Sequence, residues 1–229
     1  MLYTFFYYFL LFIIYSFIGW IMEVCVFFIR DKRLINRGFL IGPYCPIYGF
    51  CSVLMILTFG KYIATPFALF IMAAVVCTFF EYITSFIMEK LFHARWWNYT
   101  DVPFNINGRV CLHNSLLFGL LGVLLIYIVN PLLGENIKDI PQEQLIYFSS
   151  ALLIVFIVDF VISFNVISKV KSTASNLIQK DNTEEISEKV REILRKRSVF
   201  TKRLIDAFPD VKAILVKQKD KIKKQISKL

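Results

Sequence analysis

The amino-acid sequence predicts an all-α fold: a polytopic membrane helix bundle with about five transmembrane helices and a basic cytoplasmic helical tail. Hydrophobic residues fill 57% of the 229 positions and charged residues only 19%, whereas a soluble domain carries about 25% charge. The apolar residues form long runs: Glu23 is the only charged residue between positions 1 and 29, and none occurs between positions 62 and 80. Basic residues gather in alternate connecting segments and in the tail.

The uncharged runs are long enough to cross a bilayer core of ~30 Å, which takes about 20 helical residues. A soluble fold of this length has no core large enough to bury so much apolar surface. We therefore expect a transmembrane bundle over residues 1–168 and a tail over residues 169–229. The expected spans are roughly 4–29, 44–60, 65–88, 114–133 and 145–168.

The charges of the connecting segments predict an orientation. Lys and Arg number 4, 1, 3 and 1 in the successive connections and 17 in the tail. Because cytoplasmic segments carry the excess of Lys and Arg, the first and third connections and the tail are expected in the cytoplasm. The N-terminus is then expected outside the cell membrane.

The tail is expected to be helical, because Asp181, Asn182 and Thr183 are suitable N-cap residues ahead of an apolar stripe at helical spacing. It carries the whole net charge of +9. Two interpretations stay open: a solvated helix that packs on itself or on a second copy in a homo-oligomer, and a helix docked on anionic inner-leaflet lipids. Nucleic acid is not an expected partner, because aromatic residues do not interleave with the basic ones.

Acidic residues inside the apolar runs are the first candidates for function. Glu23 lies in the first span, Glu81 and Glu89 in the third, and Asp159 in the fifth. A charge at mid-bilayer costs about 2.5–3.5 kcal/mol on insertion scales, so such residues face the bundle interior or a wet cavity. They either line a path or only form hydrogen bonds to neighbouring helices.

Two connecting segments are the second candidates. Residues 36–49 hold three glycines and two prolines among apolar residues, and non-helical backbone at membrane depth must be buried in protein or line a cavity. Residues 95–109 combine two tryptophans with two arginines, an aspartate and three asparagines. Both segments are expected on the cytoplasmic side, where an arginine fork would match a phosphate or a carboxylate.

These segments and acidic residues predict a polar pocket at the cytoplasmic membrane interface for an anionic or amphiphilic molecule. The alternative is an arginine–carboxylate network that only holds the segments together. The candidate binding or pathway residues are Glu23, Arg37, Glu81, Glu89, Arg95, Trp96, Trp97, Asp101, Asn105 and Arg109.

Catalytic residues, metal sites and cofactors are not expected. The five cysteines are odd in number and form no Cys-x-x-Cys pair, so a disulfide framework or a metal site is not indicated. The sequence shows no nucleophile–base pair and no Gly-x-x-x-x-Gly-Lys-Ser/Thr phosphate loop. An enzyme is therefore not favoured.

Several motifs lie within residues 1–135. They are Tyr15–Trp20 with Glu23, Asn36–Leu40, Gly42–Gly49, Glu81, Glu89, Arg95–Tyr99, Asp101–Asn105 and Gly108–Leu112. Together they resemble a family of bacterial membrane proteins called putative ABC-transporter type IV, or putative ABC transporter permease. Asn98 departs from the family pattern, in which we expect Arg-Trp-Trp-Asp-Tyr. A site that needs an acid at position 98 would be lost here, whereas one that uses Asp101 would not.

The resemblance implies a transport-related, permease-like subunit that works with a separate ATPase subunit. Two other interpretations stay open. One is an interfacial membrane enzyme or lipid-binding protein, in which the arginines hold an anionic headgroup and Asp101 or Glu89 acts as acid or base. The other is a membrane scaffold whose tail recruits a cytoplasmic partner.

Overall fold

The computed structural model is all-α apart from one short β-hairpin, as the sequence predicts. It describes residues 1–34, 36, 38–92 and 96–180, with side chains described up to residue 168. The tail predicted at 169–229 thus lies largely outside the described residues. The elements are α1 Leu2–Asp31, α2 Pro46–Phe59, η1 Gly60–Tyr62, α3 Pro66–Phe92, β1 Asn105–Ile106, β2 Val110–Cys111, α4 Leu112–Leu124, η2 Leu125–Val129, α5 Asn130–Lys138 and α6 Gln142–Lys180.

Four of the helical segments in the described part of the chain are long and apolar enough to cross a membrane. They are Leu2–Asp31, Pro66–Leu91, Leu112–Lys138 and Gln142–Ser168. The segment expected as the second span, Pro46–Tyr62, is shorter. It is short because the preceding chain stays non-helical until Cys45, whose amide N–H donates to the carbonyl of Ser16 at 2.9 Å. Ser16 lies near the middle of α1, so α2 begins halfway along its neighbour.

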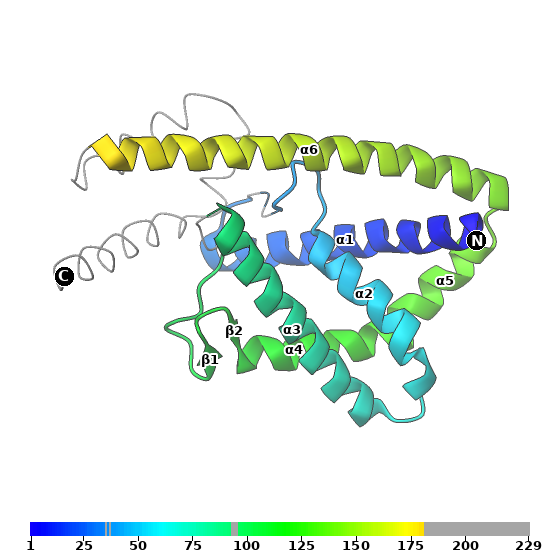
Figure 1. Ribbon diagram of the computed structural model, residues 1–229. Helices are drawn as coiled ribbons and strands as arrows, with labels where there is room; N and C mark the ends of the chain where they lie inside the picture. Colours follow the sequence, from blue (N-terminus) through cyan, green and yellow to red (C-terminus); the bar gives the residue numbers. More distant parts are fainter. Residues whose placement is uncertain (35, 37, 93–95, 181–229) are drawn as a thin grey trace.

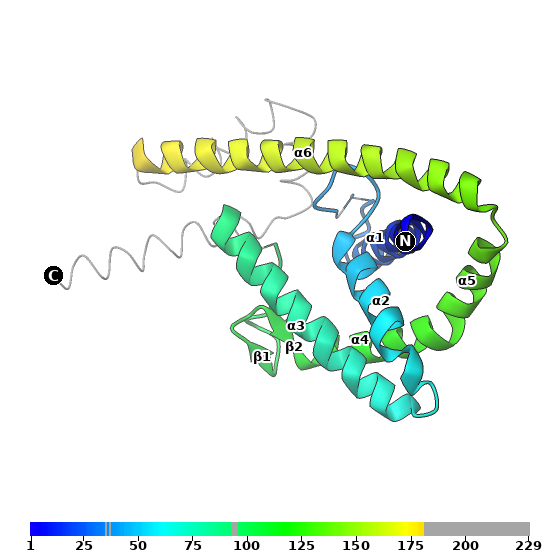
Figure 2. The same cartoon turned by 45° about the vertical axis from the view of Figure 1, so that its right-hand side comes forward.

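The fourth expected span bends instead of running straight. A π-helical turn, η2, separates α4 from α5. Pro131 stands at the start of α5 and has no N–H to donate to the preceding turn, and this loss loosens a helix locally. Figures 1 and 2 show the chain changing direction here, so that α5 leads back toward the start of α6.

The helices pack closely where small residues meet. A Cβ added at Gly49 of α2 would lie 2.2 Å from Ser16 Oγ and 2.3 Å from the carbonyl oxygen of Phe12, both in α1. Such small residues let helix backbones approach within a membrane, where packing takes over from the hydrophobic effect. The buried core lies between these helices and includes Leu11, Leu69 and Leu145, each at most 1% exposed.

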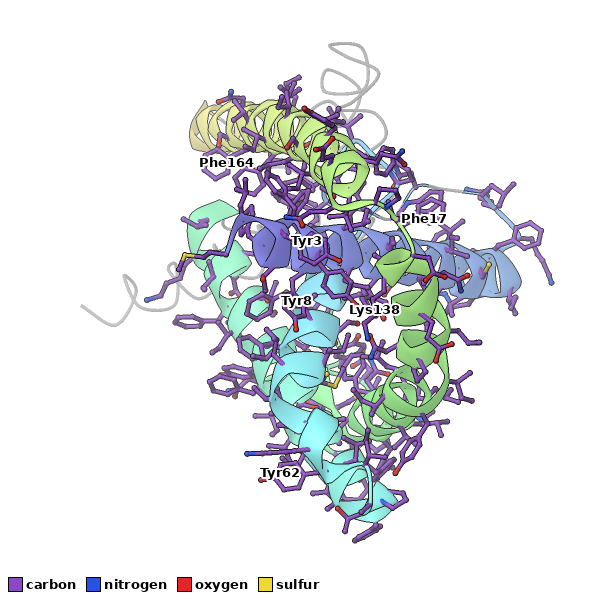
Figure 3. All side chains as sticks on the ribbon, turned by 90° about the vertical axis from the view of Figure 1, so that its right-hand side faces the viewer. Tyr3, Tyr8, Phe17, Tyr62, Lys138 and Phe164 are labelled. Atoms are coloured by element: carbon purple, nitrogen blue, oxygen red, sulfur yellow. The ribbon has the colours of Figure 1, made fainter. Side chains whose placement is uncertain are left out.

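The outer faces of the helices are apolar all round the bundle. Figure 3 shows side chains projecting from every side, among them Phe17 of α1, Tyr62 of η1 and Phe164 of α6, which are 38–43% exposed. In water this surface would be a large exposed apolar patch, whereas lipid covers it without cost. The chain is an integral membrane protein. The α6 helix continues without a break beyond residue 168, to Lys180.

Candidate functional site

A cavity of about 520 Å³ lies inside the bundle, where ligand sites between helices are common. The helices α1, α2, α3, α4 and α6 all contribute to its wall, together with η2 and the non-helical segments before α2 and after α3. The wall is mainly apolar, with Met55, Phe118, Leu125 and Phe160 among its residues. The predicted candidates that line it are Glu23, Glu81, Trp96 and Trp97.

Glu23 reaches the cavity from α1 and is held by α2. The hydroxyl of Tyr48 donates to Glu23 Oε1 at 2.6 Å. Tyr48 can lie there because Gly19, one turn before Glu23, has no side chain: an added Cβ would meet the Tyr48 ring at 2.4 Å. The glycine–tyrosine contact therefore places a phenol donor beside the carboxylate.

Glu81 reaches the cavity from the middle of α3 and is 6% exposed. The hydroxyl of Tyr99, from the segment after α3, donates to Glu81 Oε1 at 3.3 Å. The other carboxyl oxygen, Oε2, is buried and has no hydrogen-bond partner among the described residues. Burial raises the pKa of the Tyr99 phenol, and the nearby Glu81 carboxyl raises it further, so the phenol stays a donor.

Glu89 and Arg109 form an ion pair away from the cavity wall. Arg109 Nη2 lies 2.8 Å from Glu89 Oε2, and the two side chains are 10% and 15% exposed. The guanidinium also donates to Ser85 Oγ at 3.3 Å and lies over the rings of Tyr82 and Phe86. The Arg109–Glu89 pair thus holds the hairpin onto α3, as in the arginine–carboxylate network that the sequence left open as an alternative.

The hairpin itself closes through local bonds. Trp97 Nε1 donates to the carbonyl of Arg109 at 2.8 Å. Asn105 Nδ2 donates to the carbonyl of Val102 at 2.8 Å, and Asn105 Oδ1 accepts from the amide of Gly108 at 2.9 Å. Asn105 is thus a turn-forming residue, and Asp101 is exposed on the same segment. Trp96 is buried against Ile167 of α6.

Arg37 and Arg95 lie outside the described residues, so the predicted meeting of three arginines is not tested. Of the three, Arg109 is the one that the structure describes, and it is engaged by Glu89. It does not line the cavity. Among the described residues that do line it, none is Lys, Arg or His. The described part of the wall thus carries the carboxylates Glu23 and Glu81 of the predicted polar pocket, whereas Arg37 and Arg95, two of its predicted arginines, lie outside the described residues.

Asp159 of α6 holds the segment before α2. Its Oδ1 accepts from the amide of Ile41 at 3.0 Å, its Oδ2 accepts from the amide of Gly42 at 2.7 Å and from the Tyr44 hydroxyl, and Ser163 donates to Oδ1. Figure 1 shows this segment, in blue, lying between α1 and α6. Sequence reasoning singled out Asp159 but not these partners, because backbone amides leave no mark in a sequence.

Tyr48 and Tyr99 are the site residues that sequence reasoning did not assign. A signal was available, since a carboxylate inside a membrane needs a donor and both tyrosines stand in the two motif-bearing segments. The sequence did not show which tyrosine would donate to which carboxylate. Residues 36–49 alone hold two tyrosines, Tyr44 and Tyr48, and each donates to a different carboxylate.

Comparison with known proteins gives one result. No curated protein and no solved structure matches the chain. A family model described as "Putative ABC-transporter type IV" matches residues 10–164. The match continues into α6, beyond the limit near residue 135 that the motifs indicated. The chain is therefore a member of the putative ABC-transporter type IV family, an integral membrane, transport-related protein.

Proposed function

We propose that the chain is a permease-like, membrane-spanning subunit of a transport system, and that the cavity is the substrate-binding part of its path. The observation that carries this proposal is the position of Glu23 and Glu81, two carboxylates from different membrane helices, in the wall of one cavity. Ionisable residues within membrane spans usually mark substrate or ion paths. Non-helical backbone beside the cavity, at residues 39–45, is a further feature of transporter sites.

The orientation follows from the charges of the connections. With the tail in the cytoplasm and the N-terminus outside, Trp96 and Trp97 place one end of the cavity near the cytoplasmic face of the cell membrane. A reporter fused after Leu229 should then be active only as a cytoplasmic fusion, and a tag before Met1 should react with an impermeant label on intact cells. The opposite pattern would overturn this orientation.

A transport cycle driven by ATP needs a separate ATPase subunit, because these 229 residues contain no phosphate loop. We propose such a subunit as a partner, with a homo-oligomer of this chain and anionic inner-leaflet lipids at the tail as further contacts. Crosslinking in native membranes, followed by purification and mass spectrometry, should recover a protein with a phosphate loop. Recovery of the chain and its copies alone would contradict the ATPase partner.

Cysteine accessibility tests the path directly. In a background with the five native cysteines replaced, Ser52→Cys and Thr84→Cys place thiols in the cavity wall. Both should react with a membrane-impermeant methanethiosulfonate from at least one side of sealed vesicles, because a substrate path must be wet. The matched control is Phe79→Cys on α3, whose parent side chain is 57% exposed on the apolar face and which should stay unreactive in lipid.

The outcome that would overturn the path is equally clear. Ser52→Cys and Thr84→Cys would then be as unreactive as Phe79→Cys from both sides, while a thiol at the exposed position 101 still reacts. The mainly apolar wall would in that case favour the second candidate, a lipid-binding protein with a closed cavity. Native mass spectrometry would show a retained lipid in that protein.

A further inference from the structure

The unsatisfied oxygen of Glu81 indicates what the cavity binds. Glu81 is more than nine-tenths buried, and its Oε2 atom has no hydrogen-bond partner among the described residues. A buried polar atom that has lost water and gained no partner carries a substantial free-energy cost. A ligand with a donor group at this position would offset part of that cost, and a cationic donor would offset most of it.

The electrostatics of the wall point the same way. Glu23 faces the same cavity, its Oε1 atom accepting from Tyr48, and the described lining residues include no Lys, Arg or His. The guanidinium of Arg109, in the hairpin, is paired with Glu89 of α3 and does not line the cavity. An anionic ligand would therefore meet two carboxylates, whereas a cation would meet complementary charge.

Aromatic and apolar residues form the rest of the wall. Trp96 and Trp97 are among the lining residues, and tryptophan rings attract cations to their faces. Phe118, Leu125 and Val129 continue the wall along α4 and η2. A ligand that fills about 520 Å³ of this kind has a charged end beside the carboxylates and an apolar body along the helices.

We propose that the cavity binds a cationic amphiphile with a protonated primary or secondary amine; this proposal rests on the role of the cavity as a substrate site. The N–H of the ammonium group donates to Glu81 Oε2, and the hydrocarbon chain lies along α4 and η2. A quaternary ammonium has the charge but no N–H, so it leaves the Oε2 atom without a donor. The amine is therefore the better ligand of the two.

A series of head groups on one chain length tests this on the unaltered protein. The full chain, in nanodiscs of zwitterionic phosphatidylcholine, is titrated with dodecylamine, dodecyltrimethylammonium, dodecanol and dodecyl sulfate, and tryptophan fluorescence reports binding at Trp96 and Trp97. Empty nanodiscs correct for partitioning into lipid. Dodecylamine should bind at least tenfold more tightly than each of the other three.

The matched variants are Glu81→Gln in the cavity and Glu135→Gln on the exposed face of α5, which removes the same charge elsewhere. Glu81→Gln should weaken dodecylamine binding at least tenfold, and Glu135→Gln should leave it unchanged. A melting temperature measured without ligand checks that each variant is folded.

Three results would overturn the proposal: equal binding of dodecanol, which would mean a neutral carboxyl group; equal or tighter binding of dodecyl sulfate; and equal effects of the two variants. Each of these results would refute the ligand class and can be told apart from a result that refutes the cavity as a transport path. Reactive thiols at positions 52 and 84 without amine selectivity would refute the ligand class alone. Amine selectivity with unreactive thiols would refute transport and leave a binding protein.

Discussion

Residues 38–45 and residues 96–111 are both largely non-helical and both follow a membrane helix, but they are held in different ways. The first segment is fixed from a distance: Asp159, more than a hundred residues later in the chain, accepts its amide groups. The second closes on itself through Trp97 and Asn105. It is attached to the preceding helix by the Arg109–Glu89 ion pair and by hydrogen bonds from Tyr99 and Asn107. Figures 1 and 2 show the hairpin on the other side of the bundle from α6.

Because the two segments are held by different parts of the chain, they can form at different stages of folding. The hydrogen bonds described for residues 97–109 reach only α3 and the segment itself, so this part can form once that helix is in the membrane. Trp96 waits for α6, because it packs against Ile167. The first segment has unsatisfied amides until α6 arrives, and lipid offers them no partner. Its conformation, and with it the wall of the cavity at Phe39 and Leu40, therefore depends on the last described helix.

The largest expected effect comes from removing the distant carboxylate. Asp159→Ala leaves the amide of Gly42 and the hydroxyl of Tyr44 without their acceptor and weakens the bond of Ile41. At ~1–3 kcal/mol for each buried donor, the loss of stability should be about 5 kcal/mol. Hydrogen exchange should rise at Ile41 and Gly42, and the melting temperature of the purified protein should fall sharply. Asp101→Ala, at an exposed position, should change neither, and equal effects of the two variants would contradict the comparison.

The ion pair of the hairpin should give the second largest effect. Arg109→Met leaves Glu89 charged and largely buried, and breaking such a pair costs about 3 kcal/mol or more. The double variant Glu89→Leu with Arg109→Met removes both charges and should be more stable than either single variant. Thermal unfolding of the four proteins gives the coupling free energy. Additive losses would show that the pair does not hold the hairpin onto α3.

The fold class was predictable because its cause is local. Long uncharged runs determine which segments enter lipid, and three of the expected spans overlap α1, α3 and α6, although α6 continues to Lys180. The short length of the second helix was not predictable, because its start depends on a contact between Cys45 and Ser16, which lie far apart in the sequence. The bend at η2 has a sequence cause in Pro131, but the π-helical turn that results depends on packing.

The candidate site was predictable only in part, for a similar reason. Glu23 and Glu81 are conspicuous because a carboxylate is costly in lipid, and this cost can be read from sequence alone. The donor that each carboxylate finds cannot be read from the sequence. Tyr48 reaches Glu23 because Gly19 leaves room for its ring, and Tyr99 reaches Glu81 because the hairpin places it there. The sequence left two roles open for Arg109, a ligand-binding arginine or a partner of a carboxylate, and packing decides between them: Arg109 pairs with Glu89 and does not line the cavity.

Tyr99 connects the hairpin to the cavity, and its removal should have a smaller effect. Tyr99→Phe removes one hydrogen bond to Glu81, worth about 1 kcal/mol near neutral pH. Because the pKa of Tyr99 is raised in the folded protein, its stabilising contribution is complete below pH 10 and is lost as the pH rises above it. Melting temperatures measured from pH 8 to pH 11 should therefore fall less steeply in Tyr99→Phe. Parallel curves for the two proteins would contradict a buried phenol at this position.

The smallest effect is expected at Phe104, which directly precedes β1. Phe104 is 80% exposed and has a positive φ of 54°, a conformation that costs a side chain without a local polar group about 1 kcal/mol. Asn adopts this conformation more readily, so Phe104→Asn should leave the melting temperature unchanged or raise it by an amount equivalent to less than about 1 kcal/mol. A clear loss of stability in detergent would mean that the Phe104 side chain packs on the protein and contributes to holding the hairpin. An unchanged melting temperature would sharpen the contrast with residues 38–45, whose amides depend on Asp159 of α6.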